Sequence, residues 1–260
     1  MSSCFTRIEK FSPTRQFRQE FRTGVSLHSH TMHSKEFLGR LPAYIAKVPI
    51  GCYLLEREIG RSHLYTGQIY DFNKFFWTPP LSPQEAHDLE KKQIEARLGL
   101  PALVSLTDHD NIQAGIQLRV LEATSSVPIS LEWTVPYEQT EFHLGIHNLP
   151  PSRATGWGQA LTACSSRTID LFGLLAQLHS EPDVLIVLNH PYWDARGIGQ
   201  VRHRKLLQVF FEKFLPFLHA VEVNGMRPRR ENREVVVLGE EVNLPWSPEE
   251  IATDLSRTLF

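Results

Sequence analysis

TGVSLHSHTMHS, residues 23–34, is the stretch that indicates the fold most directly. An apolar run containing Val25 and Leu27 leads into closely spaced histidines, as in a short buried strand that ends in polar side chains. Because residues i and i+2 of a strand point to the same side, His28 and His30 are expected to present two imidazoles together. Neutral imidazole is a preferred ligand of zinc, manganese and iron, so the pair is either part of a metal site or a chance surface pair, and similar residues at later strand ends favour the metal site.

The same pattern recurs along the chain, where short apolar runs end in acidic, amide or histidine side chains. These runs are ALVSLTDHD (102–110), VPISLEWTV (127–135), EFHLGIHNL (141–149), DVLIVLNHP (183–191) and HAVEVNG (219–225). Helical patterns occupy 82–100, 169–179, 204–219 and 247–260. Strands alternating with helices predict an α/β fold with a parallel sheet, and the repetition favours a closed or nearly closed β/α barrel. In such a barrel the chemistry lies at the carboxyl ends of the strands.

The clearest helix signal is the segment 82–100. Ser82 is a predicted N-cap, Pro83 occupies the first helical position, Glu85 completes a capping box and Gly99 marks the end. By contrast, residues 37–80 are rich in Gly, Tyr and Pro and predict a long irregular insert after the first strand. The expected organisation is an N-terminal lead-in over 1–24 and one barrel domain over 25–260.

Composition limits the classes of protein that fit. The 260 residues are 42% apolar with a net charge of −2, which supports a substantial core and gives no specific signal for nucleic acid. No apolar run is long enough to predict a membrane span, and the N-terminus lacks the apolar centre of a signal peptide. Cys4, Cys52 and Cys164 are too far apart for a cysteine zinc motif, so a reducing, cytoplasmic location is expected. The oligomeric state has no signature in the sequence.

Taken in order, these motifs resemble the polymerase and histidinol phosphatase (PHP) family of phosphoesterases. The resemblance extends from about residue 25 to 239 and rests on SLHSHTMHS, SLTDHD, SLEW, EFHLG, LNHP and EVNG. It implies a distorted seven-stranded (β/α)7 TIM-like barrel with two or three divalent metal ions (Mn, Zn or Fe) in its mouth. It also implies hydrolysis of a phosphoric ester, on a small phosphomonoester or nucleotide-like substrate, by water that the metal ions activate.

The resemblance also implies a set of site residues. The implied metal ligands are His28, His30, His109, Glu132, His143 and His190, with Glu132 as the carboxylate that bridges two ions. Glu132, His109 and Asp108 are the expected catalytic residues. Asp108 either orients a ligand, coordinates a metal directly, or caps a helix that starts near Asn111.

Other polar residues have less specific interpretations. A substrate phosphate is expected to meet an arginine in the segment 224–232, and the alternative for that cluster is a solvated loop; its arginines are Arg227, Arg229 and Arg230. His33 and His147 are expected to lie beyond strand ends, either near the ligands or at the surface. Five further histidines are expected to be structural: His63, His87, His179, His203 and His219.

Three departures from the family pattern bear on activity. Ser26 replaces an aspartate before the histidine pair, and Ser34-Lys35 replaces a Ser-Asp, with Glu36 as the alternative carboxylate. The final Asp-x-His motif is missing, because EVNLP leads directly into a helical segment without histidine. The chain is therefore expected to be either a metal-dependent phosphoesterase or a non-catalytic barrel that binds a phosphorylated ligand or a protein partner. An amide or lactone hydrolase is less favoured, because no strand end supplies a lysine.

Overall fold

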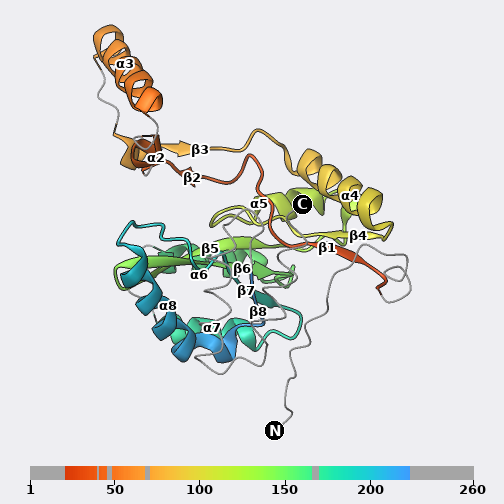
Figure 1. Ribbon diagram of the computed structural model, residues 1–260. Coiled ribbons are helices and arrows are strands. Elements are labelled where there is room, and N and C mark those ends of the chain that lie inside the picture. The colour runs from red at the N-terminus through yellow and green to blue at the C-terminus, as the bar shows by residue number, and fades with distance from the viewer. Residues whose placement is uncertain (1–20, 40, 46–48, 68–70, 166–169, 223–260) are drawn as a thin grey trace.

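The computed structural model describes residues 21–39, 41–45, 49–67, 71–165 and 170–222. Its strands are β1 (Gly24–Ser26), β2 (Glu36–Phe37), β3 (Phe76–Trp77), β4 (Ala102–Val104), β5 (Leu131–Tyr137), β6 (Thr140–His147), β7 (Leu185–Asn189) and β8 (Ala220–Val221). Its α-helices are α2 (Leu41–Ile45), α3 (Pro49–Thr66), α4 (Pro83–Leu98), α5 (Gln113–Leu118), α6 (Ala154–Ser165), α7 (Leu171–His179) and α8 (Gln200–Phe214). Short 3-10 turns occupy η1 (Phe72–Lys74), η2 (Glu122–Thr124) and η3 (Leu215–Phe217). The fold is mixed α/β (Figure 1).

Each of the six expected strands is present, and they follow one another in space. β1 pairs with β4 in parallel, and β5, β6, β7 and β8 form a second sheet in that order. A parallel bridge between His109 and Glu132 joins the segment that follows β4 to β5. Across this junction the Glu132 backbone N–H donates to the Asp108 backbone carbonyl at 3.1 Å. The Asp110 backbone N–H donates to the Glu132 backbone carbonyl at 2.8 Å. The junction brings the SLTDHD and SLEW motifs side by side.

The prediction of an all-parallel sheet is wrong for β6. This strand pairs antiparallel with both β5 and β7, whereas β7 and β8 are parallel. The physical reason is the short connection between β5 and β6. Tyr137 pairs with Thr140, so only two residues form the turn, and no crossover helix can fit between the strands. A hairpin therefore replaces one β/α unit and reverses the direction of a single strand.

The strands described here do not close into a hydrogen-bonded barrel. Within the described residues, β1 pairs only with β4, and β8 pairs only with β7. Side chains nevertheless bring the two ends of the strand series together, because His28 after β1 lies 3.2 Å from Glu222 after β8. The expected closed (β/α)7 barrel is thus replaced, over these residues, by two sheets whose ends meet at one cluster of side chains.

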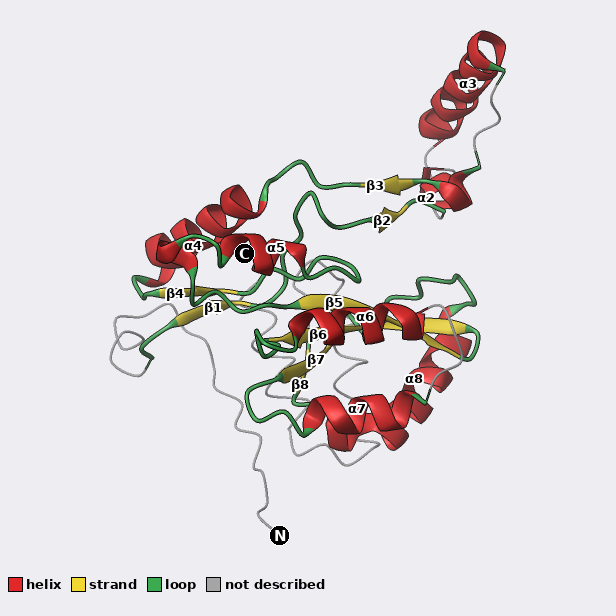
Figure 2. Ribbon diagram, turned by 180° about the vertical axis from the view of Figure 1, so that it is seen from behind, coloured by secondary structure: helices red, strands yellow, loops and turns green. Residues whose placement is uncertain are grey.

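The insert is more regular than expected. Instead of an irregular loop, it forms a small antiparallel pair, β2 with β3, the short helix α2 and the 18-residue helix α3. Figures 1 and 2 show β2, β3 and α2 lying over one side of the four-stranded sheet, with α3 extending away from the rest of the molecule. Gly51 and Gly60 lie within α3, and glycine in a helix interior weakens the helix signal in the sequence.

Local helix signals predicted α4 accurately. Ser82 accepts a hydrogen bond from the Glu85 backbone N–H, Glu85 closes the capping box, and Gly99 ends the helix with a left-handed backbone at φ 64°. The predicted helices over 169–179 and 204–219 correspond to α7 and to α8 with η3. The predicted helix over 247–260 and the lead-in before residue 21 lie outside the described residues.

Two apolar cores hold the elements in place. The larger core lies between the β5–β7 sheet and helices α6, α7 and α8, and includes Trp133, Leu144 and Phe210. The smaller core lies under α4 and α5 and includes Ile94, Val104 and Leu106. Because side chains alternate along a strand, the residues between the core-facing positions of β5 and β6 point to the opposite face of the sheet. That face carries the polar cluster described below.

No helix in the described part of the chain is long and apolar enough to cross a membrane.

Candidate metal centre

Glu132 is the centre of the polar cluster. It is the second residue of β5 and its side chain is fully buried, while its neighbours Leu131 and Trp133 point into the larger core. Gly145 on β6 lies opposite Glu132 and contributes no side chain to that space. A buried carboxylate is costly unless strong partners compensate it, and here the partners are imidazoles.

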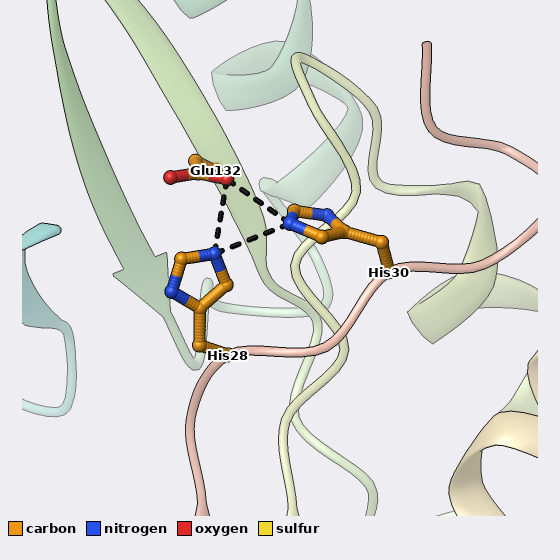
Figure 3. Close-up of side chains that lie close together, drawn as sticks. All are labelled: His28, His30 and Glu132. Carbon is orange, nitrogen blue, oxygen red and sulfur yellow. Dashed lines mark hydrogen bonds and ion pairs between the residues drawn. The ribbon is translucent and has the colours of Figure 1, made fainter. Parts of the chain in front are cut away.

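One oxygen of Glu132 faces three histidines. Its Oε2 lies 3.2 Å from His28 Nε2, 3.4 Å from His30 Nε2 and 3.5 Å from His109 Nε2. The Nε2 atoms of His28 and His30 are themselves 3.2 Å apart, and both rings point at the same carboxylate oxygen (Figure 3). β1 ends before both histidines, so the extended chain after the strand, and not the strand itself, aligns the two imidazoles.

The other oxygen of Glu132 faces two more histidines. Its Oε1 lies 2.9 Å from His190 Nε2 and 3.5 Å from His143 Nδ1, and it accepts a hydrogen bond of 3.0 Å from the Asn189 side-chain amide. His143 lies within β6 and His190 directly follows β7. The carboxylate thus separates the five histidines into one group of three and one group of two.

Two further carboxylates border the cluster. Glu36 lies 3.3 Å from His109 Nε2 and 3.9 Å from His30 Nδ1, and it accepts a hydrogen bond from Ser34 at 3.0 Å. Glu222 lies 3.2 Å from His28 Nδ1. The sequence had offered Glu36 as an alternative carboxylate, but reasoning from sequence missed Glu222. The available signal was its place at the end of the last predicted strand.

The backbone of His190 is held in an uncommon conformation. Its φ is 25°, in the left-handed region that residues other than glycine rarely adopt. The Glu222 carboxylate accepts a hydrogen bond of 2.8 Å from the His190 backbone N–H, which helps to fix this turn. Backbone strain of the kind seen at His190 is concentrated at functional sites.

His203 on α8 lies 2.8 Å from the Pro191 carbonyl and 3.0 Å from Thr140, so this buried histidine has the structural role expected of it.

Asp108 lies beside the cluster without facing it. Its buried carboxylate accepts hydrogen bonds from the backbone N–H and, at 2.7 Å, the hydroxyl of Thr31. Burial raises the pKa of Asp108 above its ordinary value, although these hydrogen bonds oppose the shift. The alternative that Asp108 caps a helix is wrong, because α5 has Ile112 at its N-cap without a side-chain cap. Asp108 instead fixes the loop that follows His30.

The electrostatics of the cluster follow from burial and from the carboxylates. Burial lowers the pKa of His28, but Glu132 and Glu222 outweigh it and raise that pKa to about 10. Burial also lowers the pKa of His109, but Glu36 and Glu132 outweigh this effect and raise that pKa to about 9. At His30 burial prevails and lowers the pKa to about 4. Burial would raise the pKa of Glu132, but its hydrogen bonds with histidines hold it well below the ordinary value.

The remaining polar residues lie elsewhere. His33 is 3.0 Å from Gln117, and Ser26 donates to Glu90, so neither contacts Glu132. The prediction that His147 lies beyond a strand end is wrong. It is the last residue of β6, is buried, and lies 2.8 Å from the Ser105 hydroxyl. His63, His87 and His179 lie on helices, and His219 lies between η3 and β8.

Two groups of predicted features fall outside the described residues. Arg227, Arg229 and Arg230, the expected phosphate-binding arginines, are among them. So is the segment after residue 222, where the family pattern places its final Asp-x-His motif.

The donor set fits divalent metal ions. A tetrahedral zinc with bonds of about 2.0–2.1 Å separates its ligand atoms by about 3.4 Å, and His28, His30 and Glu132 show separations of 3.2 to 3.4 Å. Oε2 of Glu132 and Nδ1 of His143 are buried without a hydrogen-bond partner among the described residues. A cation between them would satisfy both atoms, since buried polar atoms normally have partners.

The cluster forms the floor of a cavity of about 870 Å³. Charged side chains at its walls include Lys35, Glu141 and Arg196, and apolar walls are formed by Phe37, Phe76 and Trp193. This volume lies within the usual range of small-molecule sites. The candidate metal ligands therefore lie where a small molecule can reach them.

Comparisons with known proteins identify no family. No protein-family model matches the sequence, and no curated protein matches it. Among solved structures, the chain is similar to an amidohydrolase from Chromobacterium violaceum with bound sulfate and no metal, at 15% identity and a TM-score of 0.38. The match covers 63% of this chain and 79% of that chain. That TM-score falls short of a shared fold, so the function of the present chain is argued from its own side chains.

Proposed function

We propose that the protein is a metal-dependent hydrolase of phosphoric esters whose centre is built around Glu132. The observation that carries the proposal is the division of the histidines between the two oxygens of Glu132, three at Oε2 and two at Oε1. A carboxylate with imidazoles on both oxygens is the arrangement expected of a bridging ligand between two ions.

The proposed ligands are the residues that touch Glu132, with Glu36 and Glu222 as added carboxylates. One ion would be held by His28, His30 and Glu132, and another by His109, Glu132 and His143; His28, His190 and Glu222 offer a third group of ligand atoms. Glu36 with His30 and His109 offers a further group of ligand atoms. When bound, the divalent ions supply Lewis acidity and lower the pKa of a coordinated water.

The protein's own residues would orient and shield this chemistry. Asn189 donates to Glu132, and Asp108 fixes the Thr31 loop, so both hold the ligand side chains in place. Such supporting hydrogen bonds typically change metal affinity or activity by about 10- to 100-fold. Lys35 at the cavity wall supplies a positive charge for phosphate oxygens.

Three observations favour a phosphoric ester over an amide. The order of the motifs resembles the PHP phosphoesterases, and Lys35 and Arg196 give the cavity wall cationic groups. No lysine occurs on β4 to β8 in the described chain, although a lysine or carboxylated lysine on a middle strand is usual in the metal-dependent amide and lactone hydrolases considered above. The amide and lactone alternative therefore remains less favoured.

The direct test is hydrolysis of p-nitrophenyl phosphate by protein reconstituted with manganese, zinc or iron. We expect turnover that a chelator abolishes and that His28→Ala and Glu132→Ala each reduce by at least about 100-fold. His63→Ala, on the exposed helix α3, serves as the control and should retain activity. Metal bound without turnover on any ester, with ligand-dependent thermal stabilisation by phosphate, would favour the non-catalytic binding protein instead.

A further inference from the structure

The cavity above Glu132 has an apolar wall that the hydrolysis of a phosphate group does not require. This wall comes from the insert, through Phe37 on β2, Phe76 on β3, and Leu38 and Leu41 near α2. Trp193, in the loop after β7, adds a third aromatic side chain to the lining. Segments far apart in the sequence thus place apolar groups over one polar floor.

The two phenylalanines form a pair. Phe37 and Phe76 are register partners in the antiparallel strands, so their side chains lie on the same face, and their ring centroids are 5.9 Å apart. Both remain largely uncovered by the protein, with Phe37 46% and Phe76 52% exposed. Trp77 is equally exposed at 52%, but it is not part of the cavity lining. Alternation along β3 therefore separates a ring at the cavity from a ring outside it.

The cavity lining also includes two cationic side chains, Lys35 and Arg196. Lys35 forms no ion pair with a described residue, whereas Arg196 is paired with Glu141 at 2.7 Å. A ligand that fills the cavity would therefore meet imidazoles at the floor and both cationic and aromatic side chains at the walls. A free phosphate or a short polar ester would leave the rings in contact with water.

We propose that the substrate is a phosphomonoester whose alcohol carries an aromatic ring, with the ring packed against Phe37 and Phe76. This inference rests on the proposed function and adds the class of the leaving group. In the reaction the oxygen of water forms a bond to phosphorus, and the ester P–O bond breaks. The proton released by water ends on the departing alcohol. Aromatic pairs prefer offset or edge-to-face contacts, and two tilted rings provide both.

The test compares two ligands that differ only in the ring. Benzylphosphonate and ethylphosphonate are non-hydrolysable, and titration calorimetry with metal-loaded protein measures the affinity of each. Burial of the phenyl group should make benzylphosphonate bind about tenfold more tightly. Phe76→Ala should remove most of this ratio, and Trp77→Ala, the matched neighbour on the same strand, should preserve it.

A kinetic measurement separates this inference from the proposed function. Benzyl phosphate and ethyl phosphate both release primary alcohols, and kcat/KM should favour the benzyl ester in the wild type but much less in Phe76→Ala. Hydrolysis of both esters at equal kcat/KM, with equal affinity for the two phosphonates, would overturn the aromatic inference and leave the phosphoesterase intact. An equal loss of the ratio in Trp77→Ala would also overturn it. Failure to hydrolyse either ester or bind either phosphonate would reject the proposed function itself.

Discussion

Gly145 lies directly across from Glu132 in the β5–β6 pair, and the space beside it is filled by the side chains of His147 and Asn189. A Cβ atom at Gly145 would lie 2.7 Å from His147 Nε2 and 3.1 Å from Asn189 Oδ1. The second of these side chains donates to Glu132. The absence of a side chain at this position is therefore a requirement of the cluster.

Gly145→Ala should consequently weaken the site. Overpacking of a buried position typically costs about 1–3 kcal/mol of stability, and displacement of Asn189 should lower metal affinity as well. Urea unfolding and metal titration measure the two effects. Gly156→Ala on α6 is the matched control, because nothing lies within 4 Å of its added Cβ and alanine favours helix. Equal stability and metal affinity in Gly145→Ala and wild type would show that the contact is not a constraint.

Glu222 links the two ends of the strand series and should support metal binding. It contacts His28 Nδ1 and accepts from the His190 backbone N–H, so Glu222→Gln weakens the support of both histidines. We expect metal affinity to fall by about 10- to 100-fold. Competition with a fluorescent chelator measures the change, and Glu212→Gln, on the exposed face of α8, is the control. A variant that binds metal as tightly as the wild type would exclude Glu222 from the site.

Metal binding should release protons. Without metal, burial lowers the pKa of His28 and of His109, but the neighbouring carboxylates outweigh it and raise these pKa values to about 10 and about 9. Both imidazoles are therefore protonated at neutral pH and must lose a proton to bind a cation. Metal affinity should rise between pH 6.5 and 9, with about two protons released per chain. Calorimetry in buffers of different ionisation enthalpy counts the protons, and a count of zero would contradict this prediction.

His147 should make the metal-free protein sensitive to acid. Burial lowers its pKa from 6.5 to about 4, so between these values the unfolded chain binds a proton that the folded chain does not. Stability is then lost as the pH falls from 6.5 through 4, by up to about 3 kcal/mol. His147→Asn keeps a hydrogen-bonding partner for Ser105 and removes this titration, so its stability should decline less over that range. Urea unfolding at several pH values, with His63→Asn as the control, measures the slopes, and parallel curves for His147→Asn and wild type would refute the assignment.

The sequence predicts those features of this fold that depend on local signals. Ser82, Pro83 and Glu85 predict the start of α4 and its capping box. The structure contains this capping box because each of its contacts lies within one helical turn. The histidines could be named from the sequence because each follows or lies on an apolar run. Their convergence on Glu132 required the pairing of strands far apart in the chain.

The features that sequence reasoning missed have different physical causes. Glu222 meets His28 across 194 positions, which no local pattern records. The reversal of β6 follows from a two-residue turn after Tyr137 that lacks the usual Asn-Gly or Asp-Gly signal. Helix α3 was missed because its glycines resemble those of a loop.

The central claim is that Glu132 and the histidines around it bind divalent metal ions. Elemental analysis of protein reconstituted with manganese, zinc or iron and then freed of excess metal tests this claim most directly. The account predicts about two ions per wild-type chain, and a clear loss in Glu132→Gln that is absent from His63→Ala. A wild-type metal content near zero with all three metals, in protein that remains folded by circular dichroism, would contradict it.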